Sequence, residues 1–456
     1  MLWLSENAYF LEYNDNYQIV WHSIFGRPML IPTQLAELLR KHYLIMPSFE
    51  ESLCDFKKLA TRKMIATLEE AHILVRSDEA ERDAIQRLSL THDGYDRSQK
   101  NKIKSLSLIM SENCQFRCKY CIHFANAKHS QGHAKTMSEK IAKTSIDGYL
   151  ANLKANGIGE AYINFGGGEP LLNWNTIKVL LPYIKERGRK LNIPIRMSIN
   201  TNLALLTEEI AEDLIYYNVE IAASLDGTKE GNDAVRLTKD LTGTYNKIMR
   251  GFKILADLGH PLDGFAMTVT KDNFFDVDKP IIDWAASMGM KEVRIDIDIV
   301  GIVEIPIPSI VEALMEVRRY AKTKDINVIG FWSRPAENMG LIPEVEDVGF
   351  CGAERGNSLC VSPSGQVFPC GYSNYKLGGY TKIGSIYKTK AYIGLLQQRD
   401  LSRTRPRCGH KYCPILGFCR GGCMITHEAG DESKISRMCE LYIRMTHEIL
   451  RESAEV

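Results

Sequence analysis

Leu106-Ser107-Leu108-Ile109-Met110 and, after three intervening residues, Cys114-Gln115-Phe116-Arg117-Cys118-Lys119-Tyr120-Cys121 are the stretches that decide the fold of this chain. The first is a short, largely apolar run that predicts a buried strand. The second places C-x3-C-x2-C directly after that strand, and three thiolates on one short loop can bind three corners of an iron–sulfur cubane. The fourth iron is then open to a small chelating ligand, as in a catalytic metal site. Taken alone, the spacing leaves a zinc loop as the alternative.

Downstream, short apolar segments alternate with segments of helical periodicity. Ile146, Tyr149, Leu150 and Leu153 have the spacing of one buried helix face, and Gly157 follows them as a candidate C-cap. Strands that alternate with helices imply a parallel sheet, in which ligand sites lie at the carboxyl ends of the strands. The six predicted strands are Leu106–Met110, Ala161–Phe165, Ile195–Ile199, Ile221–Leu225, Phe265–Val269 and Val293–Ile297.

Three polar segments stand where the second, third and fourth of these strands end. They are Gly167-Gly168-Glu169-Pro170, Asn200-Thr201-Asn202, and Ser224-Leu225-Asp226-Gly227 with Asn232-Asp233 and Arg236 after it. Glycines allow close backbone approach, a carboxylate can receive an ammonium group, and a proline ends a strand. Taken alone, a segment of this kind is an ordinary turn as often as it is a binding segment. Its position after the three cysteines makes it informative here.

With Tyr120 as the aromatic residue before the third cysteine, the loop and the segments after it resemble the radical S-adenosylmethionine (SAM) superfamily. The resemblance implies that Cys114, Cys118 and Cys121 hold a [4Fe–4S] cluster. It also implies that Gly167–Pro170 binds the amino side of SAM and that Asn202 lies on the ribose side.

Ser224 and Arg236 are candidates for the SAM carboxylate, because a guanidinium fork suits a carboxylate. A turn serine and a structural arginine are the alternatives. The run that contains them resembles the S-x-D-G and H-D-x-x-R segments of the peptide-modifying and sulfatase-maturing branch, with Asn232 in place of the histidine.

The chemistry that the resemblance implies belongs to the cofactors. The open iron chelates the amino and carboxylate groups of SAM, and one electron from the cluster cleaves the sulfonium bond. The resulting 5′-deoxyadenosyl radical takes a hydrogen atom from an unactivated C–H bond. The protein orients the substrate and excludes water and oxygen. His123, just after the loop, is expected as a polar neighbour of the site, with a catalytic role as the less favoured interpretation.

Most of the remaining cysteines lie between residues 351 and 439, and their order resembles the SPASM domain, which carries two auxiliary [4Fe–4S] clusters. The resemblance implies an inner cluster without a fourth matching cysteine, so that its iron is open to substrate or takes Cys360. The ligands implied for the inner cluster are Cys351, Cys370 and Cys423, and those for the outer cluster are Cys408, Cys413, Cys419 and Cys439. The x4 gap after Cys408 departs from the x2 of that family. Zinc, with His410 as a ligand, is the alternative.

Residues 1–90 predict a small α+β module, with strands at Tyr9–Tyr13, Gln18–His22 and Met29–Ile31 before the helices. Ser48-x-x-Glu51 is a capping box that predicts a helix, in which Cys54 is expected as a buried structural thiol. Residues 78–101 are charged and predict a linker. The order of elements resembles the PqqD-like winged-helix module, which captures a leader peptide as an added strand. A plain structural domain is the alternative.

Composition excludes several other classes of protein. The chain has 456 residues, and 57 basic residues nearly cancel 56 acidic ones, so no charge argument favours nucleic acid or an anionic membrane. No basic and apolar leader is recognised at the start, and no apolar run approaches the ~20 residues that span a bilayer. The expected location is the cytoplasm, where reduced thiols serve as metal ligands rather than disulfides.

The expected architecture is an α/β fold, a partial (β/α)6 TIM-like barrel. Its expected parts are a winged-helix-like leader-binding module at 1–90, the radical SAM core at 101–305, a bridging region at 306–350 and the SPASM domain at 351–456. The expected function is a radical SAM peptide maturase that forms a thioether or carbon–carbon cross-link in a ribosomally made precursor peptide. Its electron donor is expected to be of the flavodoxin or ferredoxin type.

Two other functions compete with the maturase. An anaerobic sulfatase-maturing enzyme, which makes formylglycine, shares the core and the cysteine pattern but need not carry the N-terminal module. A non-catalytic peptide-binding or electron-transfer protein would not need the intact cysteine loop. Asp296 and Asp298, on the last core strand, are expected either to face the substrate or to be buried structural residues.

Overall fold

The computed structural model describes residues 2–44, 62–87, 91–92, 95–96, 103–122, 135–298, 301, 304–340, 350–397 and 412–454. The predictions made for Ser48, Cys54, His123, Cys408 and His410 lie outside these residues.

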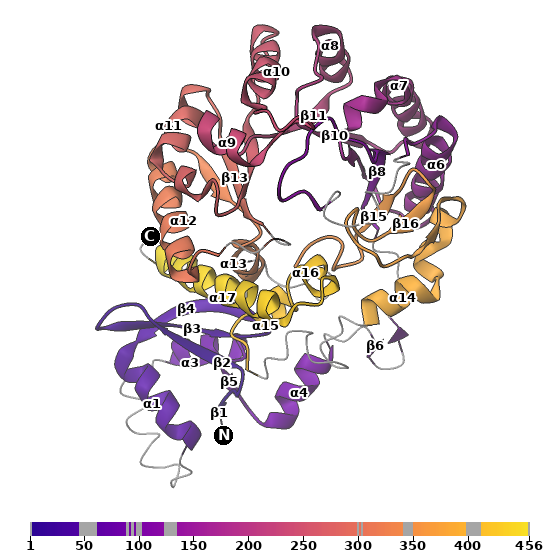
Figure 1. Ribbon diagram of the computed structural model, residues 1–456. Helices are drawn as coiled ribbons and strands as arrows, with labels where there is room; N and C mark the ends of the chain where they lie inside the picture. The colour runs from indigo at the N-terminus through magenta and orange to yellow at the C-terminus, as the bar shows by residue number, and fades with distance from the viewer. Residues whose placement is uncertain are drawn as a thin grey trace.

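A parallel sheet forms the centre of the protein (Figure 1). Each of its six central strands is parallel to the next one in chain order, which confirms the predicted alternation of strands and helices. The six are β8 (Ser105–Ser111), β9 (Ala161–Gly167), β10 (Ile195–Thr201), β11 (Val219–Ser224), β12 (Gly264–Val269) and β13 (Glu292–Ile297). A further parallel strand lies at each end, β14 (Asn327–Ile329) beside β13 and β15 (Ser358–Val361) beside β8.

Helices cover the outside of the arc that the sheet describes (Figure 1). They are α6 (Glu139–Ala155), α7 (Trp174–Leu191), α8 (Glu208–Tyr216), α9 (Lys229–Val235), α10 (Tyr245–Asp257), α11 (Lys279–Ser287) and α12 (Ile307–Thr323). In α6, the side chain of Ser138 accepts a hydrogen bond from Ile141 N as the N-cap, and Gly157 follows the C-cap with φ +68°. Tyr149 and Leu150 are fully buried against the sheet, as the helical spacing predicts.

The two faces of the sheet differ in polarity. Residues that face the helices, such as Val293 and Ile295, are fully buried and apolar. The alternate residues face the inside of the arc and include the ion pair between Arg196 and Glu220, whose side chains are 67% and 51% exposed. Since side chains alternate along a strand, the inside of the arc is an open polar surface rather than a packed apolar core.

The cysteine-rich region contains more regular structure than its low periodicity predicts. Leu359 and Val361 are fully buried in β15, which extends the central sheet. Two apolar residues are too few to show a period, so this strand was not visible in the sequence. The elements after it are β16 (Gln366–Phe368), β17 (Gly378–Gly379), η4 (Tyr380–Lys388), α14 (Lys390–Gln397), α15 (Leu416–Cys419), α16 (Met424–Glu428) and α17 (Glu432–Ala454).

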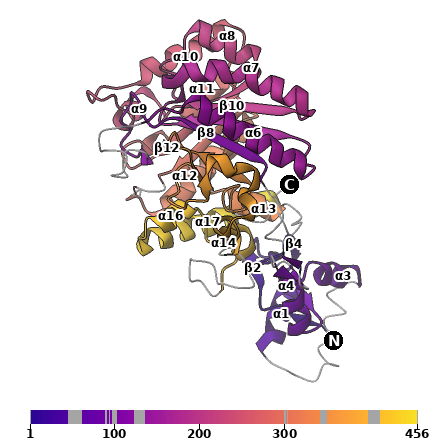
Figure 2. The same cartoon turned by 90° about the vertical axis from the view of Figure 1, so that its right-hand side faces the viewer.

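The N-terminal residues form a separate small layer at one end of the barrel (Figure 2). An antiparallel sheet has the predicted three strands in the order β2-β3-β4. The elements are β1 (Trp3–Leu4), β2 (Ala8–Glu12), β3 (Tyr17–His22), β4 (Gly26–Pro32), α1 (Thr33–Leu44), α3 (Arg62–Glu70) and β5 (Leu74–Val75), with β1 paired to β5.

The prediction of a linker over residues 78–101 is wrong in its first half, because Asp78–Arg87 forms helix α4. Ser77 Oγ accepts a hydrogen bond from Ala80 N, and the acidic residues that suggested a linker lie in the first turn, where a helix dipole favours them. Short strands β6 (Thr91–His92) and β7 (Tyr95–Asp96) pair after it.

The N-terminal layer rests on α15 and α17. Trp21 Nε1 donates to Pro414 O at 2.7 Å, and Gly417 N donates to Ser23 O at 2.8 Å. Gly417 has no side chain because a Cβ there would lie 2.4 Å from Ile24 O. In the described part of the chain, no helix combines the length and apolar character that crossing a membrane requires.

A buried polar group joins α4 to the N-terminal sheet, and Glu81 is its centre. The Glu81 carboxylate accepts from Ser5 Oγ at 2.6 Å, from Asn7 Nδ2 at 2.8 Å and from His22 Nε2 at 3.0 Å. His22 Nδ1 accepts the backbone N–H groups of Ile24 and Phe25, which assigns the proton to Nε2 in the neutral ring.

Replacing Glu81 with alanine is expected to lower the free energy of unfolding of the N-terminal layer by about 2–4 kcal/mol, because two buried donors and one half-buried donor lose their acceptor. Chemical denaturation with hydrogen exchange of residues 2–44 measures the loss. Asp83→Ala, at an exposed position of the same helix, is the control, and an equal effect of both variants would contradict the role of Glu81.

Acid is expected to weaken the same group. Burial lowers the pKa of His22, against the opposing effect of Glu81. Burial acts to raise the pKa of Glu81, but its hydrogen bonds from His22, Ser5 and Asn7 hold that pKa below the ordinary value. Both groups therefore bind fewer protons when folded, so their contribution is complete above the ordinary histidine pKa of 6.5 and is lost as the pH falls below it and then below 4.5. Urea midpoints of Glu81→Ala should depend less on pH below 4.5, because the Glu81 contribution is gone, whereas the loss of stability below 6.5 that belongs to His22 should persist.

Candidate functional site

The cysteine loop begins where β8 ends, and backbone hydrogen bonds fix it to the segment after α9. Lys119 N donates to Val235 O at 2.9 Å, and Phe116 forms an isolated bridge with Thr238. Cys114 is buried, while Cys118 and Cys121 are partly exposed. The loop is therefore held at two places, by β8 before it and by the residues at and after the end of α9. The three predicted thiols lie together on it.

The glycine-rich turn after β9 packs directly against this loop. Gly168 N donates to Ser111 O at 2.8 Å and Glu169 N donates to Asn113 O at 2.9 Å. A Cβ on Gly168 would lie 2.5 Å from Asn113 O, and one on Gly167, which has φ +128°, would lie 2.3 Å from Ser111 O. Only glycine fits both positions, so the two glycines set the place of the cysteine loop.

Glu169 is fully buried and its carboxylate is already used within the protein. It accepts from Thr201 Oγ1 at 2.7 Å, Asn202 N at 2.9 Å and Leu171 N at 3.1 Å. Burial raises the pKa of Glu169, against the effect of these hydrogen bonds. The carboxylate thus ties the end of β9 to the end of β10. Its predicted role toward the SAM ammonium stays a prediction.

Asn202 connects the second polar segment to the cysteine loop. Its Nδ2 lies 3.6 Å from Cys114 Sγ, and its Oδ1 accepts from Gln115 Nε2 at 2.9 Å. Phe116 N also donates to Cys114 Sγ at 3.3 Å. Two donors therefore face the Cys114 sulfur, which favours the thiolate that a metal ligand must supply. The ribose-side role of Asn202 is not tested by this arrangement.

Arg236 lies at the same site, but its guanidinium already donates hydrogen bonds to other residues of the protein. Its Nε and Nη2 donate to Asp226 at 2.9 and 3.1 Å, and Nη2 also donates to Tyr120 OH at 2.5 Å. The Tyr120 hydroxyl in turn donates to the Asp226 carboxylate. Asp226 is fully buried and accepts from Thr268 N as well. Arg236 thus ties the aromatic residue of the cysteine loop to the motif after β11, which matches the structural alternative for this residue.

Asn232 also has a structural role. Its Oδ1 accepts from Asp226 N at 3.2 Å, and its Nδ2 donates to Thr244 Oγ1 at 3.2 Å. Asparagine thus has both an acceptor and a donor in use at the position of the family histidine. The sequence analysis named Asp226 but assigned it no role. The signal for its ion pair was an acidic residue ten positions before Arg236 in the same motif.

Without a metal, it costs free energy to ionise the thiols of the cysteine loop. Burial raises the pKa of Cys114 to about 12 and that of Cys118 to about 11, where Arg236 opposes the rise. A metal centre supplies the positive charge that makes such thiolates stable. Sets made of thiols alone fit iron–sulfur clusters and zinc.

The thiols predicted for the two auxiliary sites fall into the predicted groups. Burial raises the pKa of Cys423 to about 12, and nearby Cys351 and Cys370 add to the rise. Cys413, Cys419 and Cys439 line one small cavity. Cys360 is buried on β15, and burial followed by the charge of Cys370 raises its pKa. The ligand assignments themselves stay predictions.

Among the described residues, no three histidine, cysteine or acidic side chains stand close enough to share one metal ion. The choice between zinc and iron–sulfur clusters stays a prediction.

Tyr372 is a site residue that the sequence analysis missed. Desolvation first, and then the charges of Cys370, Cys121 and Cys360, raise the pKa of Tyr372, although 45% of the residue is exposed to solvent. The phenol therefore lies near both the cysteine loop and the inner thiols. A tyrosine two residues after a cysteine has no distinctive spacing, and nothing in the sequence marked it.

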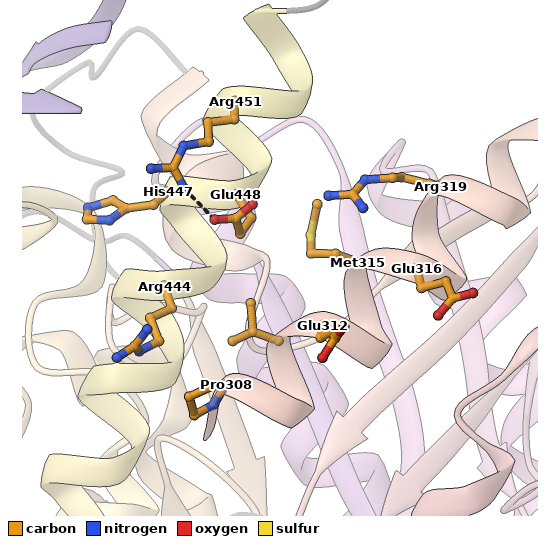
Figure 3. A pocket seen from close by; sticks show the side chains of 10 residues that line it. Pro308, Glu312, Met315, Glu316, Arg319, Arg444, His447, Glu448 and Arg451 are labelled. Carbon is orange, nitrogen blue, oxygen red and sulfur yellow. Dashed lines mark hydrogen bonds and ion pairs between the residues drawn. The ribbon is translucent and has the colours of Figure 1, made fainter. Parts of the chain in front are cut away.

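A separate groove lies between α12 and α17 on the outside of the barrel (Figure 3). It is lined by charged side chains such as Glu312 and Arg319, and by Arg451, which pairs with Glu448 at 2.5 Å. None of the predicted site residues lines it.

Comparison with known proteins gives these features a family. The Radical SAM superfamily model matches residues 108–279. The radical SAM cyclopropyl synthase TigE of Paramaledivibacter caminithermalis is 28% identical over 75% of this chain and 72% of its own length. The cysteine-type anaerobic sulfatase-maturating enzyme of Clostridium novyi is 32% identical over 34% of this chain and 41% of its own length.

Solved structures show the same fold. Native anSMEcpe with bound AdoMet superposes with a TM-score of 0.62 at 17% identity, over 77% of this chain and 99% of its own. Streptococcus suis SuiB bound to S-adenosylmethionine gives a TM-score of 0.52 at 17% identity, over 93% of this chain and 96% of its own.

The parallel sheet places a three-thiol loop beside a glycine-rich turn. The region that the Radical SAM superfamily model matches, residues 108–279, includes this loop, the turn and the Asp226–Arg236 pair. Together with the similarity to the enzymes named above, this match supports a radical SAM enzyme and implies SAM and one [4Fe–4S] cluster as cofactors.

Replacing Gly168 with alanine is expected to reduce the iron and sulfide that reconstituted protein retains to a small fraction, because the new Cβ would displace the loop that carries Cys114. Iron and sulfide analysis measures this, with circular dichroism to show that the fold persists. Gly159→Ala is the matched control, since a Cβ there meets nothing within 4 Å. Equal loading of both variants would refute the steric role.

Replacing Arg236 with methionine is expected to cost about 3–5 kcal/mol of unfolding free energy, because it leaves the Asp226 carboxylate buried and unpaired. The double variant Asp226→Asn with Arg236→Met should recover part of that loss. Chemical denaturation under anaerobic conditions measures both. A variant of unchanged stability with a raised KM for SAM would instead make Arg236 the carboxylate-binding residue.

Proposed function

We propose that this radical SAM enzyme is a peptide maturase that modifies a ribosomally made precursor peptide, forming a thioether or carbon–carbon cross-link. The observation that carries the proposal is the open polar inner face of the sheet, together with two groups of thiols: the cysteine loop after β8, and Cys351, Cys370 and Cys423, which lie near one another. A surface of this kind accommodates an extended peptide segment between two metal centres.

The residues of the chain have distinct tasks in this proposal. Cys114, Cys118 and Cys121 hold the first cluster, which with SAM supplies the 5′-deoxyadenosyl radical when both are bound. Gly167–Pro170, Asn202 and Ser224 surround the SAM side of the loop at the ends of β9, β10 and β11. The polar inner face orients the peptide so that one C–H bond meets the radical.

The C-terminal thiols hold two further clusters, as in a SPASM domain. The groups in which the described cysteines lie support this assignment, with Cys408 as the remaining outer ligand. The inner set has three assigned cysteines, Cys351, Cys370 and Cys423, so one position is left for a substrate thiolate. The electron path from a flavodoxin- or ferredoxin-type donor belongs to the same proposal.

The N-terminal layer is assigned to leader recognition. A three-stranded antiparallel sheet offers an edge to which a peptide can add as a strand. The SuiB structure covers 93% of this chain and the anSMEcpe structure 77%, a difference that is close in size to residues 1–90. Relatives named for sulfatase maturation match only 34% and 37% of this chain, whereas TigE matches 75%. These shares favour a peptide maturase over a sulfatase-maturing enzyme.

The test uses the holoenzyme and the short peptide encoded beside it, produced together under anaerobic conditions. Mass spectrometry of that peptide is expected to show the loss of two hydrogen atoms that a cross-link entails. A peptide of unchanged mass, from protein that forms 5′-deoxyadenosine, would reject the maturase.

Thiol variants separate the two metal regions. Cys118→Ala is expected to abolish formation of 5′-deoxyadenosine, since the first cluster loses a ligand. Cys370→Ala is expected to retain SAM cleavage but lose the cross-linked product. Chromatography of SAM products and peptide mass spectrometry on the same sample measure both. Retained peptide product in Cys370→Ala would contradict a role for the inner thiols.

A further inference from the structure

Arg334 stands beyond β14 with an unusual set of neighbours. Its guanidinium carbon lies 4.4 Å from the centre of the Phe331 ring and 5.6 Å from that of Phe350. The two rings are stacked at 6.1 Å. In the described part of the chain, Arg334 enters no ion pair, although its side chain is partly buried. Aromatic rings hold the stem and plane of an arginine but leave its outer N–H groups in need of an acceptor.

A second guanidinium shares the same ring. Arg294 lies 4.7 Å above the centre of Phe331. Its Nε donates to Asp296 Oδ2 at 2.6 Å, and Phe331 N donates to Asp296 Oδ1 at 2.7 Å. Asp296 thereby fixes both Arg294 and the backbone at Phe331. The buried structural interpretation of Asp296 fits this arrangement.

The strand register places Arg294 on the inner face of the sheet. Ser224 pairs with Ala266, and Ala266 pairs with Arg294. These three residues therefore form one row across three strands, with about 10 Å between the Cα atoms of Ser224 and Arg294. Arg294 points to the same space as the candidate SAM residues, two strands away from them.

The two guanidiniums at this ring differ in their partners. Arg294 is paired with the Asp296 carboxylate. Glu337, one turn after Arg334, accepts a hydrogen bond from Ser333 Oγ at 2.5 Å and keeps its own charge. Among the described residues, no carboxylate lies within ion-pair distance of the Arg334 guanidinium, and an anion bound there would pair with it.

We propose that Arg334, supported by Arg294 and the Phe331 ring, binds a carboxylate of the substrate peptide, and that an acidic side chain near the modified residue supplies it. The inference rests on the proposed function, since it names a chemical feature of that peptide substrate. A bound carboxylate about two strands from Ser224 would fix the position of the peptide relative to the radical. Arg334 is accordingly a specificity-determining residue.

The experiment measures binding of three short peptides to the reconstituted holoenzyme with SAM, by saturation-transfer NMR. The probes are acetyl-Gly-Glu-Gly-amide, its glutamine counterpart, and acetyl-Gly-Gly-Gly with a free carboxyl end. The glutamate peptide is expected to bind at least about tenfold more tightly than the glutamine peptide, the difference that a charge-assisted hydrogen bond makes. Preference for the free-acid peptide would assign the site to a C-terminal carboxylate. Equal binding of all three, or none, would overturn the proposal.

Arg334→Met should remove the preference for glutamate while keeping the stem between the rings, and Arg334→Lys should restore part of it. Arg319→Met, in the outer groove of Figure 3, is the control and should bind as the unaltered protein does. Formation of 5′-deoxyadenosine is measured in parallel. If Arg334→Met raised the SAM concentration needed for cleavage, the guanidinium would serve SAM and the proposal would fail.

The two proposals fail in different ways. Peptide binding with the expected preference, but no cross-linked product from the neighbouring precursor, would reject the maturase and leave the carboxylate site intact. A cross-linked product that forms equally well with Arg334→Met, across precursors with and without an acidic residue, would reject the carboxylate site alone.

Discussion

Two backbone hydrogen bonds, from Gly168 N to Ser111 O and from Glu169 N to Asn113 O, hold the cysteine loop against the turn after β9. They require a distance at which no side chain fits on Gly167 or Gly168. The place of Cys114 follows from them, and so does the reach of Asn202 to its sulfur. The parallel register of β8 and β9 makes this approach possible, because it brings both strand ends to one edge.

The sequence predicted the features that repeat or that carry rare residue types. The six strands followed from periodicity, and the grouping of the described cysteines followed from the resemblance to the SPASM domain. Helix α4 did not, because its acidic first turn looks like a solvated linker unless Glu81 is known to be buried. Nor did the pairing of Arg236 with Asp226, since a motif gives order along the chain and not which side chains meet. Contacts between distant segments, such as Tyr120 with Asp226, are set by tertiary packing.

The buried charged groups of the site are paired with one another or with hydrogen-bond donors. Few of them are left to bind a ligand. Glu169 is satisfied by three donors, and Asp226 by Arg236, Tyr120 and Thr268. These hydrogen bonds hold the Glu169 and Asp226 carboxylates in fixed positions at the ends of β9 and β11. Such pre-organisation matters for an enzyme that must hold one C–H bond close to a short-lived radical.

The turn between β3 and β4 sits on α15, through Gly417 N to Ser23 O and the close approach of Gly26 to Phe418. That helix ends in Cys419. An N-terminal layer grafted from a distant relative would have to reproduce this turn, or it would displace the helix that carries Cys419. The turn and that helix therefore constrain each other's sequence, although one belongs to the first residues of the chain and the other to its cysteine-rich region.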